Sequence, residues 1–297
     1  MPSRCPKTAL RQGSQLEWVI DQAVSPVDSL LERPESSNLL ALRVDMSLRF
    51  AMRLLLALSV LAAWPYVAIA QSFSVNPVAD AFLFSGEADN NYGGGGVFAV
   101  SALGSPEGEF QSLLRFDLSA AKSSFDLFFG VGNWSLGSAV LQLSAASPNN
   151  SIFNDSSAGQ FAATWLQNDA WEEGTGAPTL PGDSGITFNS LPSILSAGDQ
   201  DAGTFAFDGA TSGAASYSLT LSSGLIEDAT AGELASIRLR AAAGDTTMSG
   251  AFNSRSFSTV SRRPLLTLNA VAVPEPATWL LAGCGVVALA VFRRARK

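Results

Sequence analysis

Residues 216–221 read SYSLTL, a stretch in which polar and apolar side chains alternate. Successive side chains of an extended strand point to opposite faces, so this period of two places Tyr217, Leu219 and Leu221 together on one face. The same pattern recurs in five further runs, at 112–116, 140–144, 204–207, 236–240 and 265–268. Such runs predict half-buried β-strands.

Turn-forming segments separate these runs. They are rich in Gly, Asn, Asp, Ser and Pro, as at 93–96, 147–150 and 181–185. Short strands joined by such loops predict an all-β domain, built as an antiparallel two-sheet β-sandwich of jelly-roll-like topology. The stretch 223–232 has some helical character, but it is short and has Gly near both ends, so we expect one turn or a loop there.

We place this single domain at 71–273, a length typical of one β-sandwich with a sizeable core. It holds seven Lys and Arg against nineteen Asp and Glu, a net charge of −12. That acidity opposes binding to nucleic-acid phosphates, which needs clustered cations. The segment also holds no His and no Cys, which excludes disulfides, Cys/His zinc sites and imidazole acid–base chemistry within it.

A secretory signal precedes the domain, at 46–70. A short basic region leads into the apolar run 54–63, and small residues follow at Ala68 and Ala70. This is the layout of a signal peptide, whose helix enters the Sec translocon and is cleaved, here before Gln71. The alternative is a first transmembrane helix, for which the apolar run is short.

Residues 1–45 do not fit this plan, because they are polar, charged and without pattern. They would bury the signal inside the chain, whereas signal peptides are N-terminal. We therefore regard 1–45 as a doubtful leader. Either translation starts at Met46 or Met52, or the leader is unusually long.

The chain ends in three parts that together predict a membrane tail. They are Val273, Pro274, Glu275 and Pro276, then the uncharged run 277–292, then the basic end 293–297. The uncharged run predicts a transmembrane helix, slightly shorter than the usual span. By the positive-inside rule its basic end stays in the cytoplasm, so the tail 274–297 holds the exported domain on the outer face of the inner membrane.

This order of motif, apolar helix and Arg-rich end resembles the PEP-CTERM sorting signal. The resemblance implies that an exosortase of a Gram-negative bacterium processes the tail near 273–276. It also implies a protein of the cell-envelope surface or the secreted fraction, anchored only transiently in the inner membrane, that accompanies exopolysaccharide in biofilms. An ordinary tail anchor is the alternative.

An ordered series of short motifs runs through the domain: ADAF at 79–82, NNYG at 90–93, SLLRFDL at 112–118, AVLQL at 139–143, WEEGT at 171–175, FNS at 252–254 and RPLL at 263–266. This series resembles the DNRLRE domain, a β-sandwich grouped with a family of carbohydrate-binding modules. The resemblance implies that the domain binds polysaccharide. The chain departs from the family pattern where Phe110 and Gln111 precede Ser112 in place of an Arg. If that Arg contacts an anionic glycan in the family, the contact is lost here.

Trp165, Trp171 and the neighbouring Glu172 are the candidate carbohydrate-binding residues, and Trp134 is a further indole of the domain. An indole face can stack on the apolar face of a sugar while polar neighbours bond the sugar hydroxyls. The competing interpretation is that these indoles pack in the core, as large aromatic side chains commonly do.

Asp80, Asp89 and Asn90 are the candidate metal ligands. Calcium takes roughly six to eight oxygen ligands, which carboxylates and amides supply. A structural Ca²⁺ is therefore the one cofactor that the sequence raises, although no EF-hand loop is present.

We expect no catalytic residue and no enzyme activity. The GDSG at 182–185 resembles the nucleophile loop of serine proteases, but that chemistry needs a His. Glu172 and Glu173 are adjacent, so on a strand they point to opposite faces and do not form the facing carboxylate pair of a glycosidase. Two alternatives to a polysaccharide-binding domain stay open: a structural matrix protein without a discrete ligand, and a lyase or hydrolase that uses carboxylates with Tyr92 or Tyr217.

Overall fold

The computed structural model describes residues 69–149 and 151–273, with Gly283, Gly285, Arg293 and Arg294 of the tail. Apart from these positions, the predicted leader, signal helix and transmembrane helix lie outside the described residues. Within the described part of the chain, no helix has both the length and the apolarity needed to cross a membrane.

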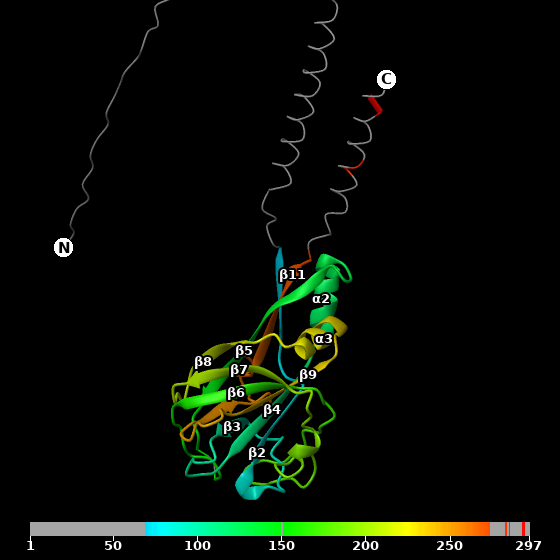
Figure 1. The fold of residues 1–297 in the computed structure, drawn as a ribbon. Helices are drawn as coiled ribbons and strands as arrows, with labels where there is room; N and C mark the ends of the chain where they lie inside the picture. The colour runs from blue at the N-terminus through cyan, green and yellow to red at the C-terminus, as the bar shows by residue number, and fades with distance from the viewer. Residues whose placement is uncertain (1–68, 150, 274–282, 284, 286–292, 295–297) are drawn as a thin grey trace, which may run out of the picture. The chain divides into compact units, whose positions relative to one another are not determined.

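Strands are the main secondary structure of the described chain (Figure 1). They are β1 Ala70–Val75, β2 Ala79–Phe84, β3 Val97–Ser101, β4 Phe110–Asp117, β5 Trp134–Ala146, β6 Gly159–Leu166, β7 Gln200–Phe207, β8 Ala214–Leu219, β9 Leu234–Ala241, β10 Ser249–Asn253 and β11 Leu265–Ala272. The helices are α2 Ser119–Phe129 and α3 Ser223–Ala231, and short 3-10 turns lie at η1 Ser85–Glu87, η2 Leu191–Ser193 and η3 Val260–Arg262.

The strands form a curled antiparallel sheet in the order β1-β11-β5-β10-β3-β4-β9-β6-β7, with β2 paired to β4 and β8 paired to β5. The prediction of an all-β antiparallel fold is therefore confirmed. Two separate sheets are not confirmed, because β10 pairs with β5 on one side and with β3 on the other and so joins all strands into one path.

The alternation that predicted the strands corresponds to burial. Tyr217 and Leu219 of β8 are buried, and so are Ile237 and Leu239 of β9. Strand β8 ends at Leu219, so Leu221 lies just beyond it and is only half-buried.

Strand β4 is buried on both faces, which its sequence shows as two adjacent leucines. Leu114 belongs to the main core with Phe116. Leu113 belongs to a second cluster, together with Ala81 and Leu83 of β2. A strand covered on both faces no longer needs strict alternation.

A long loop, 167–199, joins β6 to β7 and covers this second face. Trp171, Ile186, Leu191 and Ile194 of the loop complete the second cluster. A loop that is packed against the domain in this way must satisfy its backbone N–H and C=O groups with partners other than water.

The amide of Asn91 satisfies three of those groups and the N–H of Gly93, and Asn91 itself is fully buried. Its Nδ2 donates to the carbonyl oxygens of Glu173 and Ile186, both at 2.8 Å. Its Oδ1 accepts from the backbone N–H of Gly93 at 3.1 Å and of Gly176 at 3.2 Å. All the hydrogen-bonding capacity of this side-chain amide is therefore used, and three of its four bonds attach the loop.

Two glycines make this approach of backbones feasible. A Cβ on Gly93 would lie 1.8 Å from the carbonyl oxygen of Glu173, and a Cβ on Gly176 would lie 1.8 Å from that of Asn91. The glycine run 93–96, predicted as a turn, is thus a close-packed contact at its first residue.

Both α-helices differ from the sequence prediction. Residues 223–231 form α3 rather than one turn or a loop, because Ser222 caps the helix by accepting from Leu225 N–H at 3.2 Å. Helix α2 was not predicted at all. Its buried positions are Ala121 and Phe125, one helical turn apart, and so short a periodic signal is hard to separate from a loop.

Replacement of Asn91 by Ala should lower the free energy of unfolding by about 2–4 kcal/mol, because it leaves several buried backbone groups without partners. Urea denaturation followed by circular dichroism measures the loss. Asn90→Ala is the matched control: its side chain is only part-buried and donates to Glu87, so its loss should be about 1 kcal/mol. Equal losses for the two variants would contradict the role given to Asn91.

Candidate functional site

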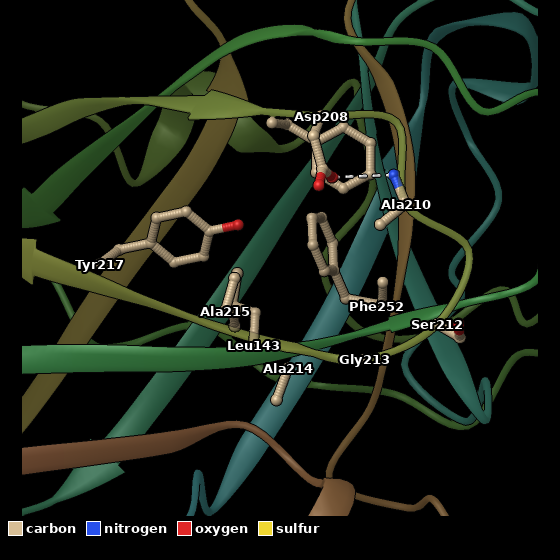
Figure 2. A pocket seen from close by; sticks show the side chains of 11 residues that line it. Leu143, Asp208, Ala210, Ser212, Gly213, Ala214, Ala215, Tyr217 and Phe252 are labelled. Atoms are coloured by element: carbon tan, nitrogen blue, oxygen red, sulfur yellow. Dashed lines mark hydrogen bonds between the residues drawn. The ribbon is translucent and has the colours of Figure 1, made fainter.

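A hollow of about 100 Å³ opens where β7 turns into β8 (Figure 2). Aromatic rings form much of its wall, a carboxylate lies at its rim, and small residues of the turn complete it. The larger side chains that line the hollow are Leu143, Phe207, Asp208, Tyr217 and Phe252.

Strand pairing and ring contacts hold these side chains in place. The ring centroids of Phe207 and Phe252 lie 5.4 Å apart, and Tyr217 packs edge-on against Phe161 at 4.9 Å. The turn is tight because its residues are small and Gly213 has a φ of 92°. The Tyr217 ring is thus fixed with its hydroxyl directed toward the hollow (Figure 2).

The electrostatics of the hollow favour binding over proton transfer. Burial raises the pKa of Tyr217, and the negative charge of Asp208 raises it further. The hydroxyl therefore remains protonated at neutral pH, whereas a tyrosine that acts as a base needs a lowered pKa. Asp208 Oδ1 accepts from the N–H of Ala210 at 3.0 Å, which orients the carboxylate.

The size of the hollow limits what it can hold. Pockets for whole small molecules usually measure about 300–1,000 Å³. About 100 Å³ has room for one substituent or one edge of a ligand. Aromatic faces, a hydroxyl and a carboxylate together suit a neutral, hydroxyl-bearing edge.

The two predicted processing sites lie side by side at one end of the sheet. Ala70 and Gln71 begin β1, which pairs with β11, and Ala70 lies opposite Val271. The N–H of Ala272 donates to the carbonyl of Ile69 at 3.2 Å. Ala68 and 274–276 lie outside the described residues. The described residues of both predicted cleavage sites therefore lie at the same end of the domain.

The hollow lies far from that end. Strand β5 begins at Trp134, opposite Ala272, and Leu143 of the hollow comes nine residues later. At about 3.3 Å per residue, this places the hollow about 30 Å along the strand from the tail.

A buried charged cluster joins three distant segments. Asp80 is only 2% exposed; its backbone N–H donates to Glu173 Oε1 at 2.9 Å, and its carboxylate accepts from the N–H of Arg255. The guanidinium of Arg255 forms an ion pair with Glu173. Burial raises the pKa of Asp80 from its ordinary 3.8 to about 7, and the nearby charge of Glu173 adds to the rise.

The structure buries both indoles that the sequence offered as sugar platforms. Trp165 is 6% exposed, and its Nε1 donates to Asp228 at 2.6 Å. Trp171 is 3% exposed, donates to Ser236 at 2.9 Å and packs its ring against the guanidinium of Arg115. Neither ring has a free face, so the stacking role predicted for them is withdrawn. Glu172, which follows Trp171 directly, is exposed.

The three candidate calcium ligands have separate partners. Asp80 belongs to the buried cluster with Glu173 and Arg255, Asp89 accepts from Asn189 at 2.7 Å, and Asn90 donates to Glu87 at 2.7 Å. Among the described residues, no group of three or more His, Cys, Asp or Glu side chains gathers as a metal site. The structure thus gives no support to a calcium site built on this trio.

The remaining catalytic candidates also take part in structural contacts. Glu173 is bound to Arg255 and accepts from the backbone N–H of Asp80, so it is not a free carboxylate. The loop 182–185 pairs with Asn91 through Gly182. Tyr92 is buried, and burial together with its bond to Glu87 raises its pKa to about 12.

Sequence reasoning missed most of the hollow. Tyr217 was singled out only as an enzymatic alternative, and Asp208, Phe207 and Phe252 were not singled out as ligand contacts. Asp208 lies in a turn, and aromatic residues that alternate along strands resemble ordinary core positions.

Comparison with known proteins adds one finding at the end of the chain. A model of the PEP-CTERM protein-sorting motif matches residues 272–297. The tail is a PEP-CTERM sorting motif. It implies an exported, envelope-associated protein that an exosortase processes, and it confirms that part of the prediction. No curated protein matches the chain, and the DNRLRE resemblance stays a prediction.

The buried Asp80 should make the domain less stable as the pH rises. A carboxyl whose pKa is raised in the folded state binds more protons folded than unfolded, so its contribution is lost between pH 3.8 and about 7. At about 1.36 kcal/mol for each pH unit, the loss is up to about 4 kcal/mol. Urea denaturation at several pH values measures it, and Asp80→Asn should flatten the slope.

Asp117 supplies a control of opposite sign. Hydrogen bonds from Ser119 lower the pKa of Asp117, so its contribution is present above pH 3.8 and lost on acidification. Asp117→Asn should therefore cost stability at neutral pH and have no effect in acid. An unchanged pH slope in Asp80→Asn would show that Asp80 is not the group responsible.

Proposed function

We propose that this chain is an exported, non-catalytic β domain that an exosortase processes and that associates with extracellular polysaccharide at the surface of a Gram-negative cell. The observation that carries the proposal is the PEP-CTERM motif at 272–297. Its support from the fold is the position of both processing sites at one end of the sheet. Before processing, the tail anchors the domain in the inner membrane.

The proposed contact with polysaccharide is the hollow at the β7–β8 turn, in place of the two buried indoles. It combines aromatic walls with the Tyr217 hydroxyl and the Asp208 carboxylate. It lies about 30 Å along β5 from the tail, so a tethered domain leaves it accessible. The resemblance to carbohydrate-binding modules points to the same class of ligand.

The proposal includes a division of the curled sheet into the two sheets of a sandwich. The junction of β10 with β5 has two residue pairs, and that of β3 with β4 has one. We infer that these short pairings mark the borders of a sandwich, with β1-β11-β5-β8 in one sheet, β2-β4-β9-β6-β7 in the other and β10-β3 between the two borders. Two sheets packed face to face in this way are the β-sandwich arrangement.

The second candidate is a structural surface protein with no discrete ligand. The burial of Trp165 and Trp171 favours it, because the residues best suited to stack on sugars serve packing instead. An enzymatic function has less support: the pKa values of both Tyr92 and Tyr217 are raised, which disfavours either as a base.

Substitution of Pro274, Glu275 and Pro276 by Ala should leave the chain uncut and retained in the membrane fraction of an exosortase-bearing host. The motif is the element that the processing enzyme reads, while the apolar run and basic end remain. Immunoblots of cell fractions, with and without the exosortase, measure this. Glu227→Ala, a charge change on exposed surface of α3, is the control and should be processed normally. Normal processing of the motif variant would contradict the proposal.

Tyr217→Phe and Asp208→Asn should each weaken retardation of the protein in gels that contain host exopolysaccharide, by about three- to tenfold in affinity, the effect of one hydrogen bond. Both changes preserve shape, and the amide that replaces the Asp208 carboxylate keeps an oxygen for the Ala210 N–H. Asp183→Asn, at an exposed loop position, is the control. Retardation that survives both changes would place the contact elsewhere, and none for the unaltered protein would favour the structural candidate.

A further inference from the structure

An apolar surface lies at the end of the domain from which the tail leaves. Its members, which we call the end patch, are Leu127, Phe128, Val131 and Val273, and each is exposed. Leu127 and Phe128 lie in the last turn of α2, and Val131 lies in the turn that leads into β5. The N–H of Val273 donates to the carbonyl of Asn133 at 3.0 Å, which joins the chain end to that turn.

Helix α2, which carries two residues of the end patch, departs from the usual pattern of a surface helix. Helix α2 buries Ala121 and Phe125 against the domain, and the ring of Phe125 contacts Trp134 at 5.0 Å. A helix packed in this way normally exposes polar residues on its other side. Instead, Leu127 is 90% exposed and Phe128 is 53% exposed. Large apolar side chains gathered on a surface mark an interaction site.

The segment after Val273 identifies the partner. The uncharged run of the tail begins at Ala277, four residues further on. Four residues extend at most about 14 Å, so the apolar run begins within that distance of Val273, one member of the end patch. Figure 1 shows α2 beside the end of β11, the strand that leads into the tail.

The charges around the end patch also favour a lipid surface over a charged partner. The nearest charged side chains of α2, Lys122 and Asp126, form an ion pair with each other. The patch itself carries no charge. Its binding should therefore depend on apolar contact, as in helices that rest in the membrane interface.

We propose that the end patch rests on the outer surface of the inner membrane while the tail is uncut, with Leu127 and Phe128 inserted at the lipid interface. The inference rests on the proposed membrane insertion of the tail. It gives the domain two attachments to the bilayer, the tail and the end of α2, which fix its orientation with the hollow directed away from lipid.

Site-specific fluorescence on the full chain tests this. Cys5→Ser and Cys284→Ser remove the native thiols, and Leu127→Cys then carries an environment-sensitive dye. The chain is placed in nanodiscs of zwitterionic lipid, one chain in each, with or without brominated acyl chains. We expect a blue shift and a loss of roughly half the emission with brominated lipid, as for a side chain at the acyl boundary. High salt should not change this.

Leu103→Cys in the same background is the matched control. Leu103 is 76% exposed, and it lies in the hairpin between β3 and β4, at the end of β4 opposite to α2. Its dye should show neither shift nor quenching. Phe128→Ser with Val131→Ser should reduce quenching at position 127 and leave the circular dichroism spectrum unchanged, because all three side chains are exposed.

Three outcomes would overturn the inference. If the chain does not float with the discs, the tail does not insert, and the proposed anchoring fails together with the patch. If the chain floats with the discs but the dye at position 127 is not quenched, the tail does insert and only the inference about the end patch fails. If Leu127→Cys chains instead form disulfide-linked dimers in vesicles and remain unquenched in single-chain discs, a second copy of the chain covers the patch.

Discussion

The hydrogen bonds of the Asn91 side-chain amide are the constraint on which the packing of the loop 167–199 against the domain depends. A loop as long as 167–199 contains no strand, so its backbone groups have no ladder in which to pair. Asn91 provides partners for three of them at one point, and the close approach of Gly93 and Gly176 brings the two backbones within reach. With the loop attached there, Trp171 can cover Arg115, and Glu173 reaches Asp80.

Several residues that resemble binding residues in the sequence instead make structural contacts, and some of these contacts depend on the attached loop. Trp165 bonds to Asp228 and Trp171 bonds to Ser236, so each indole joins a loop or helix to the sheet. Glu173 cannot act as a free carboxylate, because Arg255 and the backbone of Asp80 occupy it. Burial then raises the pKa of Asp80 to about 7 because the charged form loses water that its few partners only partly replace.

The sequence predicted what is local and periodic, and it failed where distant segments meet. Alternation placed Tyr217, Leu219, Ile237 and Leu239 correctly, because burial on one face of a strand imposes a period of two. The tail was predictable because its motif and basic end are contiguous. By contrast, the three Asn91 bonds to the loop span more than eighty positions along the chain, and no local pattern encodes them. The exposure of Trp165 could not be judged either, because its partner is on α3.

The two ends of the described domain expose side chains of different chemistry. Strands β1 and β11 bring both ends of the described domain out beside α2, where the exposed side chains of the end patch are apolar. The β7–β8 turn, about 30 Å away along β5, carries a hydroxyl and a carboxylate beside aromatic rings. A domain held at one end by a tail alone could swing freely, but a second apolar contact through α2 would restrict that motion. The polar hollow would then face the medium throughout the time that the tail remains uncut, and cleavage at 273–276 would remove the tail and leave Leu127 and Phe128 of α2 as the remaining contact with lipid.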